Sequence, residues 1–175
     1  VYAGSLRSNA FEEGPRVPGE LWRIEGAGRA TAVYEGIEFA NGVGFSPDGR
    51  TVYHSNYSEG VVLAHDLDET GRGIGRRSFV RLPKGNPDGL AVDENGGVWV
   101  AGADAGVVFR FTPKGALDSV LEVPSPFVTS LCFGGADRRD LYVVTAANRD
   151  HPERRGTVFR ARSDVAGLVA PLARV

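Results

Sequence analysis

The chain has 175 residues, of which 42% are hydrophobic, and this is enough for one domain with a core of its own. Its formal net charge of −2 argues against nucleic-acid or anionic-membrane partners, and no apolar run reaches the roughly 18 residues of a membrane span. The single cysteine, Cys132, excludes an internal disulfide and a cysteine-built zinc site, and we interpret it as a buried, inert thiol.

Short β-branched and aromatic segments, separated by glycine and proline, start with the first residues. The segment 1–5 (VYAGS) predicts a strand, and two more are predicted at 19–23 (GELWR) and 31–34 (TAVY). The 24 glycines and 10 prolines are spread along the chain between such segments. This pattern is typical of an all-β protein.

The next stretch supplies four predicted strands in series. They are 41–45 (NGVGF), 51–53 (TVY), 60–63 (GVVL) and 77–80 (RSFV). The first two are joined by SPDG, and Pro-Asp-Gly favours a tight turn that needs a positive φ. The segment is therefore a complete four-stranded unit.

The same series recurs twice more along the chain. The second copy has strands at 88–92 (DGLAV), 97–100 (GVWV), 106–110 (GVVFR) and 118–121 (DSVL), and the third at 129–133 (TSLCF), 141–144 (LYVV) and 156–160 (GTVFR). The glycines that begin equivalent strands, at 19, 60, 106 and 156, are 41, 46 and 50 residues apart. A period of about 40–50 residues with four short strands predicts a β-propeller.

We therefore predict a single all-β domain, a β-propeller of four-stranded antiparallel blades. Blade segments are expected at 1–36, 41–82, 88–123 and 129–175, and the first and last of them are incomplete. Since propellers close a ring of about 4–8 blades, we expect missing N-terminal blades or a second chain to close it. A closed four-blade ring and a β-sandwich with coincidental repeats are the alternatives.

Polar residues open three of the predicted inner strands. Asn41, Asp88 and Thr129 occupy equivalent places in successive repeats, so a propeller would bring them together near its axis. Amide and carboxylate oxygens there would suit a divalent cation. Turn capping is the alternative role, because Asn and Asp before Gly often cap turns. The three histidines, His54, His65 and His151, lack metal-ligand spacing and are interpreted as surface or loop residues.

Three segments resemble the senescence-marker-protein/gluconolactonase/regucalcin-like family. Residues 41–53 are similar to its NGLAWSPDGRTLY segment, residues 87–101 to PDGLAVD…GxLWVA, and residues 133–143 to FGGxD…LYVT. The resemblance covers nearly the whole chain and implies the C-terminal portion of a six-bladed propeller, with about three to four blades present. It also implies one divalent cation at the axis, Ca²⁺ first, with Zn²⁺, Mn²⁺ and Mg²⁺ as alternatives.

The resemblance assigns roles to individual residues. Asn41 and Asp88 correspond to metal ligands, and Asp88 is also the expected catalytic base. Substrate contacts are expected from residues around the same mouth, which are Asn56, Tyr57, Asp104, Thr129, Glu12 and Glu13. The family's remaining metal-binding Glu and its substrate-binding Arg and Asn have no counterparts in this chain.

These features together predict a metal-dependent hydrolase that opens a sugar lactone or a similar small ester. The cation would stabilise the oxyanion that forms on the lactone carbonyl. The alternatives are a non-catalytic propeller that binds calcium or a partner protein, and an inactive fragment of such an enzyme. We expect a small-molecule lactone or ester substrate, no nucleic-acid or membrane partner, and a cytoplasmic location, although a chain beginning at Val1 can have lost a signal peptide.

Overall fold

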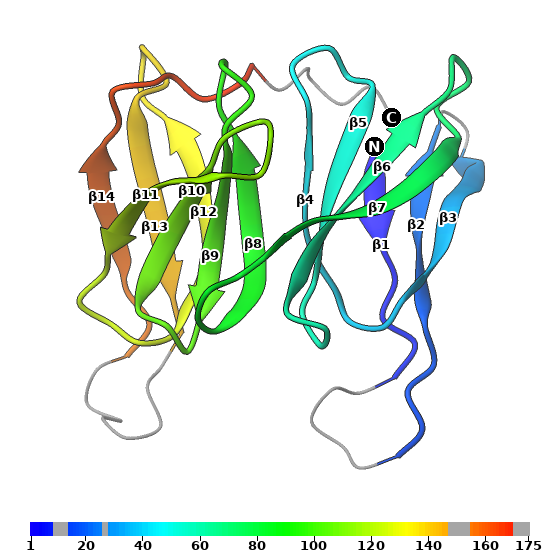
Figure 1. The fold of residues 1–175 in the computed structure, drawn as a ribbon, viewed down its shortest axis with the longest axis horizontal. Helices are drawn as coiled ribbons and strands as arrows, with labels where there is room; N and C mark the ends of the chain where they lie inside the picture. The colour runs from blue at the N-terminus through cyan, green and yellow to red at the C-terminus, as the bar shows by residue number, and fades with distance from the viewer. Residues whose placement is uncertain (9–13, 26–27, 147–154, 170–175) are drawn as a thin grey trace.

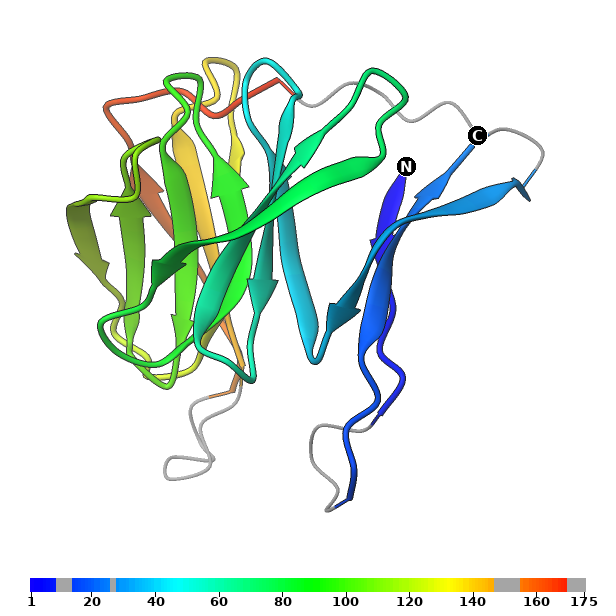
Figure 2. The same ribbon diagram turned by 45° about the vertical axis from the view of Figure 1, so that its right-hand side comes forward.

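The computed structural model describes residues 1–8, 14–25, 28–146 and 155–169, and every element of secondary structure in them is a β-strand. The strands form four antiparallel sheets that follow one another along the chain (Figures 1 and 2). This arrangement confirms the predicted all-β propeller architecture. We number the sheets blade 1 to blade 4 in chain order.

Each blade is a meander of neighbouring strands. Blade 1 contains β1 (Tyr2–Gly4), β2 (Gly19–Ile24) and β3 (Ala30–Ile37). Blade 2 contains β4 (Ala40–Phe45), β5 (Thr51–Asn56), β6 (Val61–Leu67) and β7 (Gly73–Arg81). Blade 3 contains β8 (Asn86–Val92), β9 (Val98–Ala103), β10 (Val107–Phe111) and β11 (Leu117–Glu122). Blade 4 contains β12 (Val128–Gly134), β13 (Asp140–Thr145) and β14 (Val158–Arg162).

Blades 2 and 3 are complete, whereas blades 1 and 4 have three described strands each. The innermost strands of blades 2, 3 and 4 are β4, β8 and β12, and β8 contacts both of the others. In blade 1 the first strand, β1, pairs with β2, the counterpart of the third strand of the repeat, so β1 occupies the second-strand position. Within the described residues, blade 1 therefore has no strand in the innermost position.

The cores lie between the blades, because strand alternation presents an apolar face on each side of a sheet. One cluster joins blades 2 and 3 and includes Tyr53, Val62 and Leu90. A second joins blades 3 and 4, where Trp99 packs edge-on against Phe133 with ring centroids 5.6 Å apart. Smaller clusters join blades 1 and 2. Packing between neighbours thus fixes the arc on which the inner strands lie.

After β14 the chain returns to blade 3. Gly167 forms an isolated bridge with Asp93, and the Leu168 amide donates to the Val92 carbonyl at 3.0 Å. This segment ties blade 4 to the end of β8 that lies away from Asp88. In the described part of the chain, no helix has the length and apolarity of a membrane span.

Two predictions about single residues were wrong. Cys132 is exposed rather than buried, because Leu131 turns towards the blade 3 core and Cys132 alternates to the other face of β12. His54 and His65 are buried strand residues rather than surface residues, with 0% and 2% exposure. The second strand of blade 2 runs on through His54 to Asn56, where the sequence predicted a loop. His151 lies outside the described residues.

Candidate metal and substrate site

A bulge interrupts each inner strand at the residue that the sequence singled out. In β4 the pairing shifts between Ala40 and Val43, around Asn41. In β8 it shifts between Pro87 and Leu90, around Asp88, and in β12 between Val128 and Ser130, around Thr129. A bulge leaves a residue out of the ladder and re-aims its side chain. The repeat therefore places the same irregularity at the same height in three neighbouring blades.

Glycine after the bulged residue lets the inner strands approach closely. A Cβ at Gly42 would lie 2.6 Å from the Asp88 carbonyl oxygen, and a Cβ at Gly89 would lie 2.5 Å from Ser130 Oγ. Neither distance leaves room for a methyl group. The pairs Asn41-Gly42 and Asp88-Gly89 thus combine a polar side chain with the smallest possible spacing between neighbouring blades.

The Asp88 carboxyl group is partly buried, and no cationic side chain in the described part of the chain pairs with it. Burial raises the pKa of Asp88 from 3.8 to about 6, while hydrogen bonding by the Asn41 side chain and the Gly89 amide lowers it. Within the described residues, no arginine or lysine forms an ion pair with Asp88. The Asn41 side chain is thus close enough to act on the Asp88 carboxyl group, and the role of the pair as metal ligands stays a prediction.

Asn41 and Asp88 supply part of the ligand set that a divalent cation requires. A partly buried carboxylate without a counter-charge is a favourable place for a cation, and an amide oxygen beside it is a suitable second ligand. The described residues hold no group of three or more His, Cys, Asp or Glu side chains placed for a metal. Since Ca²⁺ takes 6–8 oxygen ligands, Asn41 and Asp88 would form one side of its coordination sphere.

Tyr57 lies near three polar residues, which are Asn86, Asp104 and Asp88. Burial raises the pKa of Tyr57, as do the charges of Asp104 and Asp88, whereas hydrogen bonding by the Asn86 side chain lowers it. Asp104 is exposed in the turn after β9 and has a φ of 59°, a left-handed conformation that Asp tolerates. Tyr57 therefore lies within electrostatic range of Asp88 and Asp104, and the substrate contacts expected of Tyr57 and Asp104 stay predictions.

Asn86 was missed by the sequence analysis. It opens β8 and precedes Asp88 by two residues, in the segment Asn86-Pro87-Asp88. Its side-chain oxygen would lie 3.7 Å from a Cβ at Gly60, so it reaches across to the turn that follows Tyr57. An amide two residues from the expected ligand was the available signal.

The other candidate residues are placed differently. Asn56 is fully buried rather than at the rim, and neither atom of its amide has a hydrogen-bond partner in the described structure. The Thr129 hydroxyl donates to the Val144 carbonyl of its own blade at 3.2 Å. Glu12 and Glu13 lie outside the described residues. Of the predicted residues, Asn41 thus acts on Asp88 directly, and Tyr57 lies within electrostatic range of Asp88.

Along the axis from the mouth at Asp88 the surroundings become apolar. A cavity of about 350 Å³ is lined by the middle of β4, β8 and β12, including Phe45, Leu90 and Phe133, together with the segment Leu168–Val169. The polar residues are confined to the strand entries, so a bound molecule would meet its polar partners only at the mouth.

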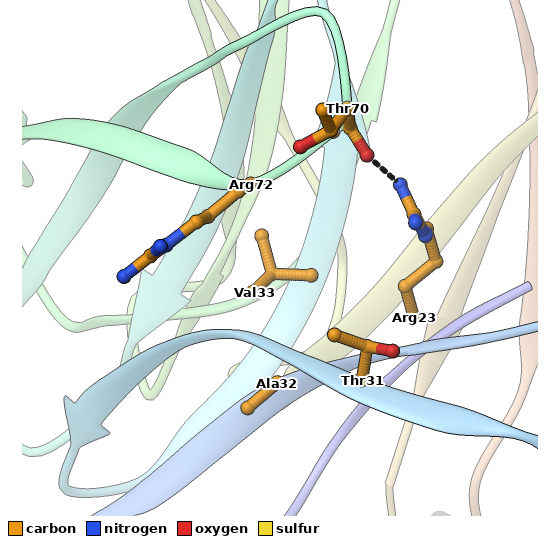
Figure 3. A pocket seen from close by; sticks show the side chains of 7 residues that line it. Arg23, Thr31, Ala32, Val33, Thr70 and Arg72 are labelled. Atoms are coloured by element: carbon orange, nitrogen blue, oxygen red, sulfur yellow. Dashed lines mark hydrogen bonds between the residues drawn. The ribbon is translucent and has the colours of Figure 1, made fainter.

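A second hollow, of about 270 Å³, lies between blades 1 and 2 at the β6–β7 turn (Figure 3). Arg23 spans it, donating to the Thr70 carbonyl and pairing with Glu25 at 2.7 Å. Arg72 points away from Arg23 in this view. The Arg23 guanidinium joins the two blades across this hollow. The β6–β7 turn lies at the end of β6 away from Asn56, and so away from the proposed site. We therefore interpret this hollow as part of the interface between the blades.

Comparison with known proteins agrees with this geometry. Residues 1–147 match a family model described as the SMP-30/gluconolactonase/LRE-like region. The chain is 33% identical over 180 residues to 6-deoxy-6-sulfogluconolactonase of Pseudomonas putida, and the match covers 98% of this chain and 60% of that protein. It is 35% identical over 172 residues to pentonolactonase XacC of Haloferax volcanii, covering 97% of this chain and 57% of that protein.

A solved structure has the same arrangement of strands. The calcium-binding protein regucalcin from Agrobacterium tumefaciens superposes with a TM-score of 0.80 at 28% identity, over 90% of this chain and 56% of that one. The chain thus spans less than two thirds of the length of each of these three proteins.

Proposed function

Because the chain belongs to the SMP-30/gluconolactonase/LRE-like family, we propose that it is a lactonase that opens a sugar lactone or a similar small ester with the help of one divalent cation. The observation that carries this proposal is the pairing of Asn41 with a partly buried, uncompensated Asp88 at matching bulges. Two relatives named for lactone hydrolysis, at 33% and 35% identity, support the same reaction class.

The reaction adds water to the lactone carbonyl and breaks the ring C–O bond to give a hydroxy acid. A cation held by Asn41 and Asp88 would polarise that carbonyl. Asp88 would accept a proton from the attacking water as the general base. Asn41 orients the Asp88 carboxylate. The Tyr57 hydroxyl and the Asp104 carboxylate would bind the substrate's hydroxyl groups.

Part of the proposal concerns the ring. We infer that further blades, supplied by additional sequence or by a second chain, complete both the site and the single propeller domain. The support is that blade 1 has no described innermost strand beside β4, and that Asn41 and Asp88 provide only part of a cation's ligands. Asn41 stands at the side of the arc where that strand belongs.

A non-catalytic calcium-binding propeller is the second candidate. It is favoured by the likeness to a regucalcin structure that is named a calcium-binding protein. Both functions use the same two ligands, so cation binding alone does not distinguish them. Hydrolysis of a lactone distinguishes them, because only the lactonase would carry it out.

The test is hydrolysis of gluconolactone, followed by acid release at constant pH, with Ca²⁺, Mn²⁺ or Zn²⁺ added after chelation. We expect cation-dependent turnover that falls by at least about 100-fold in Asp88→Ala, since that variant loses both a ligand and the base. The control is Asp164→Asn, an exposed aspartate whose side chain makes no described hydrogen bond.

Three outcomes would separate the candidates. Cation-dependent hydrolysis that Asp88→Ala abolishes supports the lactonase. Cation binding without hydrolysis of any aldonolactone or simple ester, once further blades or a second chain close the ring, would favour the binding protein instead. Equal hydrolysis by the parent chain and by Asp88→Ala would contradict the assignment of the site.

A further inference from the structure

Three rings, which we call the stack although only two of them lie face to face, join blade 1 to blade 2 apart from the proposed site. Tyr34 of β3 hydrogen-bonds through its hydroxyl to His54 Nδ1 of β5 at 2.8 Å. The same Tyr34 ring lies flat on His65 of β6, with centroids 3.5 Å apart and planes 4° from parallel. His54 is 0% and His65 2% exposed, so both imidazoles are part of the interface between the blades.

Each imidazole has one nitrogen with nothing to bond to. The Nε2 atoms of His54 and His65 are buried and have no hydrogen-bond partner in the described part of the chain. Around His54 Nε2, β1 packs so closely that a Cβ at Gly4 would lie 3.6 Å away, and the Ala40 side chain adjoins the same point. A neutral ring can leave this nitrogen without its proton, whereas a charged ring must place an N–H there without an acceptor.

The charged groups around the stack also disfavour a proton on it. The Arg76 guanidinium of β7 acts on both rings and is held by the carbonyls of Glu35 at 3.3 Å and Gly36 at 2.8 Å. Arg77 and Asp66 also act on His65, and they neutralise each other in an ion pair of 2.7 Å. Among the described residues, Asp66 is the only carboxylate that acts on either ring, and it is already paired with Arg77.

We propose that the stack of Tyr34, His54 and His65 is an acid-sensitive latch, which holds blade 1 against blade 2 while both histidines are neutral and releases it when either is protonated. The Tyr34 ring also contacts His54 in a tilted arrangement, with ring centroids 5.8 Å apart, so one tyrosine contacts both histidines. Protonation of one ring disfavours protonation of the other, because each charge would lie in the same dry interface.

The direction in which pH changes the stability of the latch follows from the pKa shifts of the two histidines. Burial, then His65 and Arg76, lowers the pKa of His54 from 6.5 to about 3. Burial, then Arg76 and Arg77, lowers the pKa of His65 from 6.5 to about 4. Since the unfolded chain binds protons first, the latch contributes fully above about pH 6.5 and is lost as the pH falls towards 4 and then 3.

Separation of blade 1 from blade 2 would affect the mouth of the proposed site through β4. Ala40 adjoins both Gly4 of blade 1 and Asn41 of the proposed site, so separation of the blades would disturb a cation ligand. This consequence for activity rests on the proposed function. The latch itself does not, and the experiment below measures it without substrate or cation.

The two tryptophans report on different blades. Trp22 lies in β2 of blade 1, and Trp99 lies in β9 of blade 3. Trp99→Phe and Trp22→Phe therefore give full chains that each carry a single fluorophore, to be titrated with acid in chelator while emission and hydrogen exchange are followed. We expect the Trp22 signal and the exchange of β1–β3 to change at a higher pH than the Trp99 signal.

Variants then test the histidines. His65→Phe keeps a ring on Tyr34 but cannot be protonated, and it should lower the Trp22 midpoint by at least about 0.5 pH unit. His54→Gln should do the same while retaining a partner for Tyr34. Tyr53→Phe, on the other face of β5, should leave the midpoint unchanged. The latch is wrong if both blades open together in the parent, or if the histidine variants open at the parent's pH.

Discussion

Asp93 is the most heavily bonded carboxylate in the described structure. It is fully buried and accepts hydrogen bonds from the Gly97 amide at 2.8 Å, Trp99 Nε1 at 2.9 Å and Arg110 Nε at 2.9 Å. The Arg110 side chain, 13% exposed, pairs also with Asp118 at 2.6 Å. One aspartate thus fixes the β8–β9 turn and joins it to β10.

We expect Asp93→Ala to lower the free energy of unfolding by about 3–5 kcal/mol, because it leaves Arg110 and two buried donors, the Gly97 amide and Trp99 Nε1, without their acceptor. The measurement is urea unfolding followed by Trp99 fluorescence. The matched control is Asp118→Ala, which removes the exposed partner of the same arginine and should lower it by no more than about 1 kcal/mol. Equal losses would show that burial of Asp93 does not set its contribution.

Asp88 should behave in the opposite way when no cation is bound. Because burial raises its pKa to about 6, the stabilising contribution of its neutral form is present below about pH 3.8 and is lost as the pH rises through 6. At pH 7.5 in chelator, Asp88→Asn should therefore unfold at a higher temperature than the parent, by up to about 3 kcal/mol in free energy.

Added Ca²⁺ should reverse that order, raising the melting temperature of the parent and leaving Asp88→Asn nearly unchanged. The same measurement decides between the metal-ligand and turn-capping roles of Asp88. If Asp88 only caps the turn at Gly89, Asn preserves the cap, and neither protein responds to the cation.

At the level of strands, the repeat predicted the number, order and pairing of the elements well, but their ends poorly. Turn residues such as those in Ser46–Gly49 mark where strands stop, and these limits were visible in the sequence. The polar run from His54 to Asn56 was predicted as a loop, yet it continues β5 because Tyr34 and blade 1 bury it. Tertiary contact of this kind has no local pattern.

In the candidate site, too, residues set by the repeat were predictable from the sequence, and residues set by tertiary packing were not. Asn41 and Asp88 were predictable because the repeat places them at equivalent positions, and a ring brings equivalent positions together. Asn86 was not, because it has no equivalent in the other repeats and acts across the gap between blades 2 and 3. The burial of Asn56 likewise depends on packing rather than on pattern.

The inner strands approach each other so closely that Gly42 and Gly89 should not tolerate a larger residue. Gly42→Ala and Gly89→Ala should each lower the free energy of unfolding by about 1–3 kcal/mol and weaken cation binding, since the added methyl pushes neighbouring blades apart at the mouth. Unfolding and calorimetric titration with Ca²⁺ measure the two effects.

Gly75→Ala in β7 is the control for these glycines. A Cβ there would meet only Asp66 Oδ2, at an ordinary 3.6 Å, so it should change neither property. Undiminished cation affinity in both inner-strand variants would mean that their spacing does not shape the site.

For the whole molecule, the open question is what covers the outer face of blade 4. That face exposes Val144 at 39% and Val158 at 62%, paired across β13 and β14, and Cys132 on β12 belongs to the same side. In a propeller such a face packs against the next blade, as the equivalent faces of blades 2 and 3 do here. Cys132, the chain's one cysteine, is therefore a probe of ring closure.

We expect Cys132 to react with a thiol reagent at the rate of a free exposed cysteine when the chain is an 18.6 kDa monomer. It should react at least about 10-fold more slowly when further blades or a second chain close the ring, because the thiol then lies in an interface. Labelling rates are measured alongside the mass in solution, with the unfolded chain as the reference for full reactivity. Dilution distinguishes the two sources of closure, since a second chain dissociates and restores fast labelling, whereas blades on the same chain do not. Slow labelling of a proven monomer of this chain would contradict the open arc and favour a ring closed by its four blades alone.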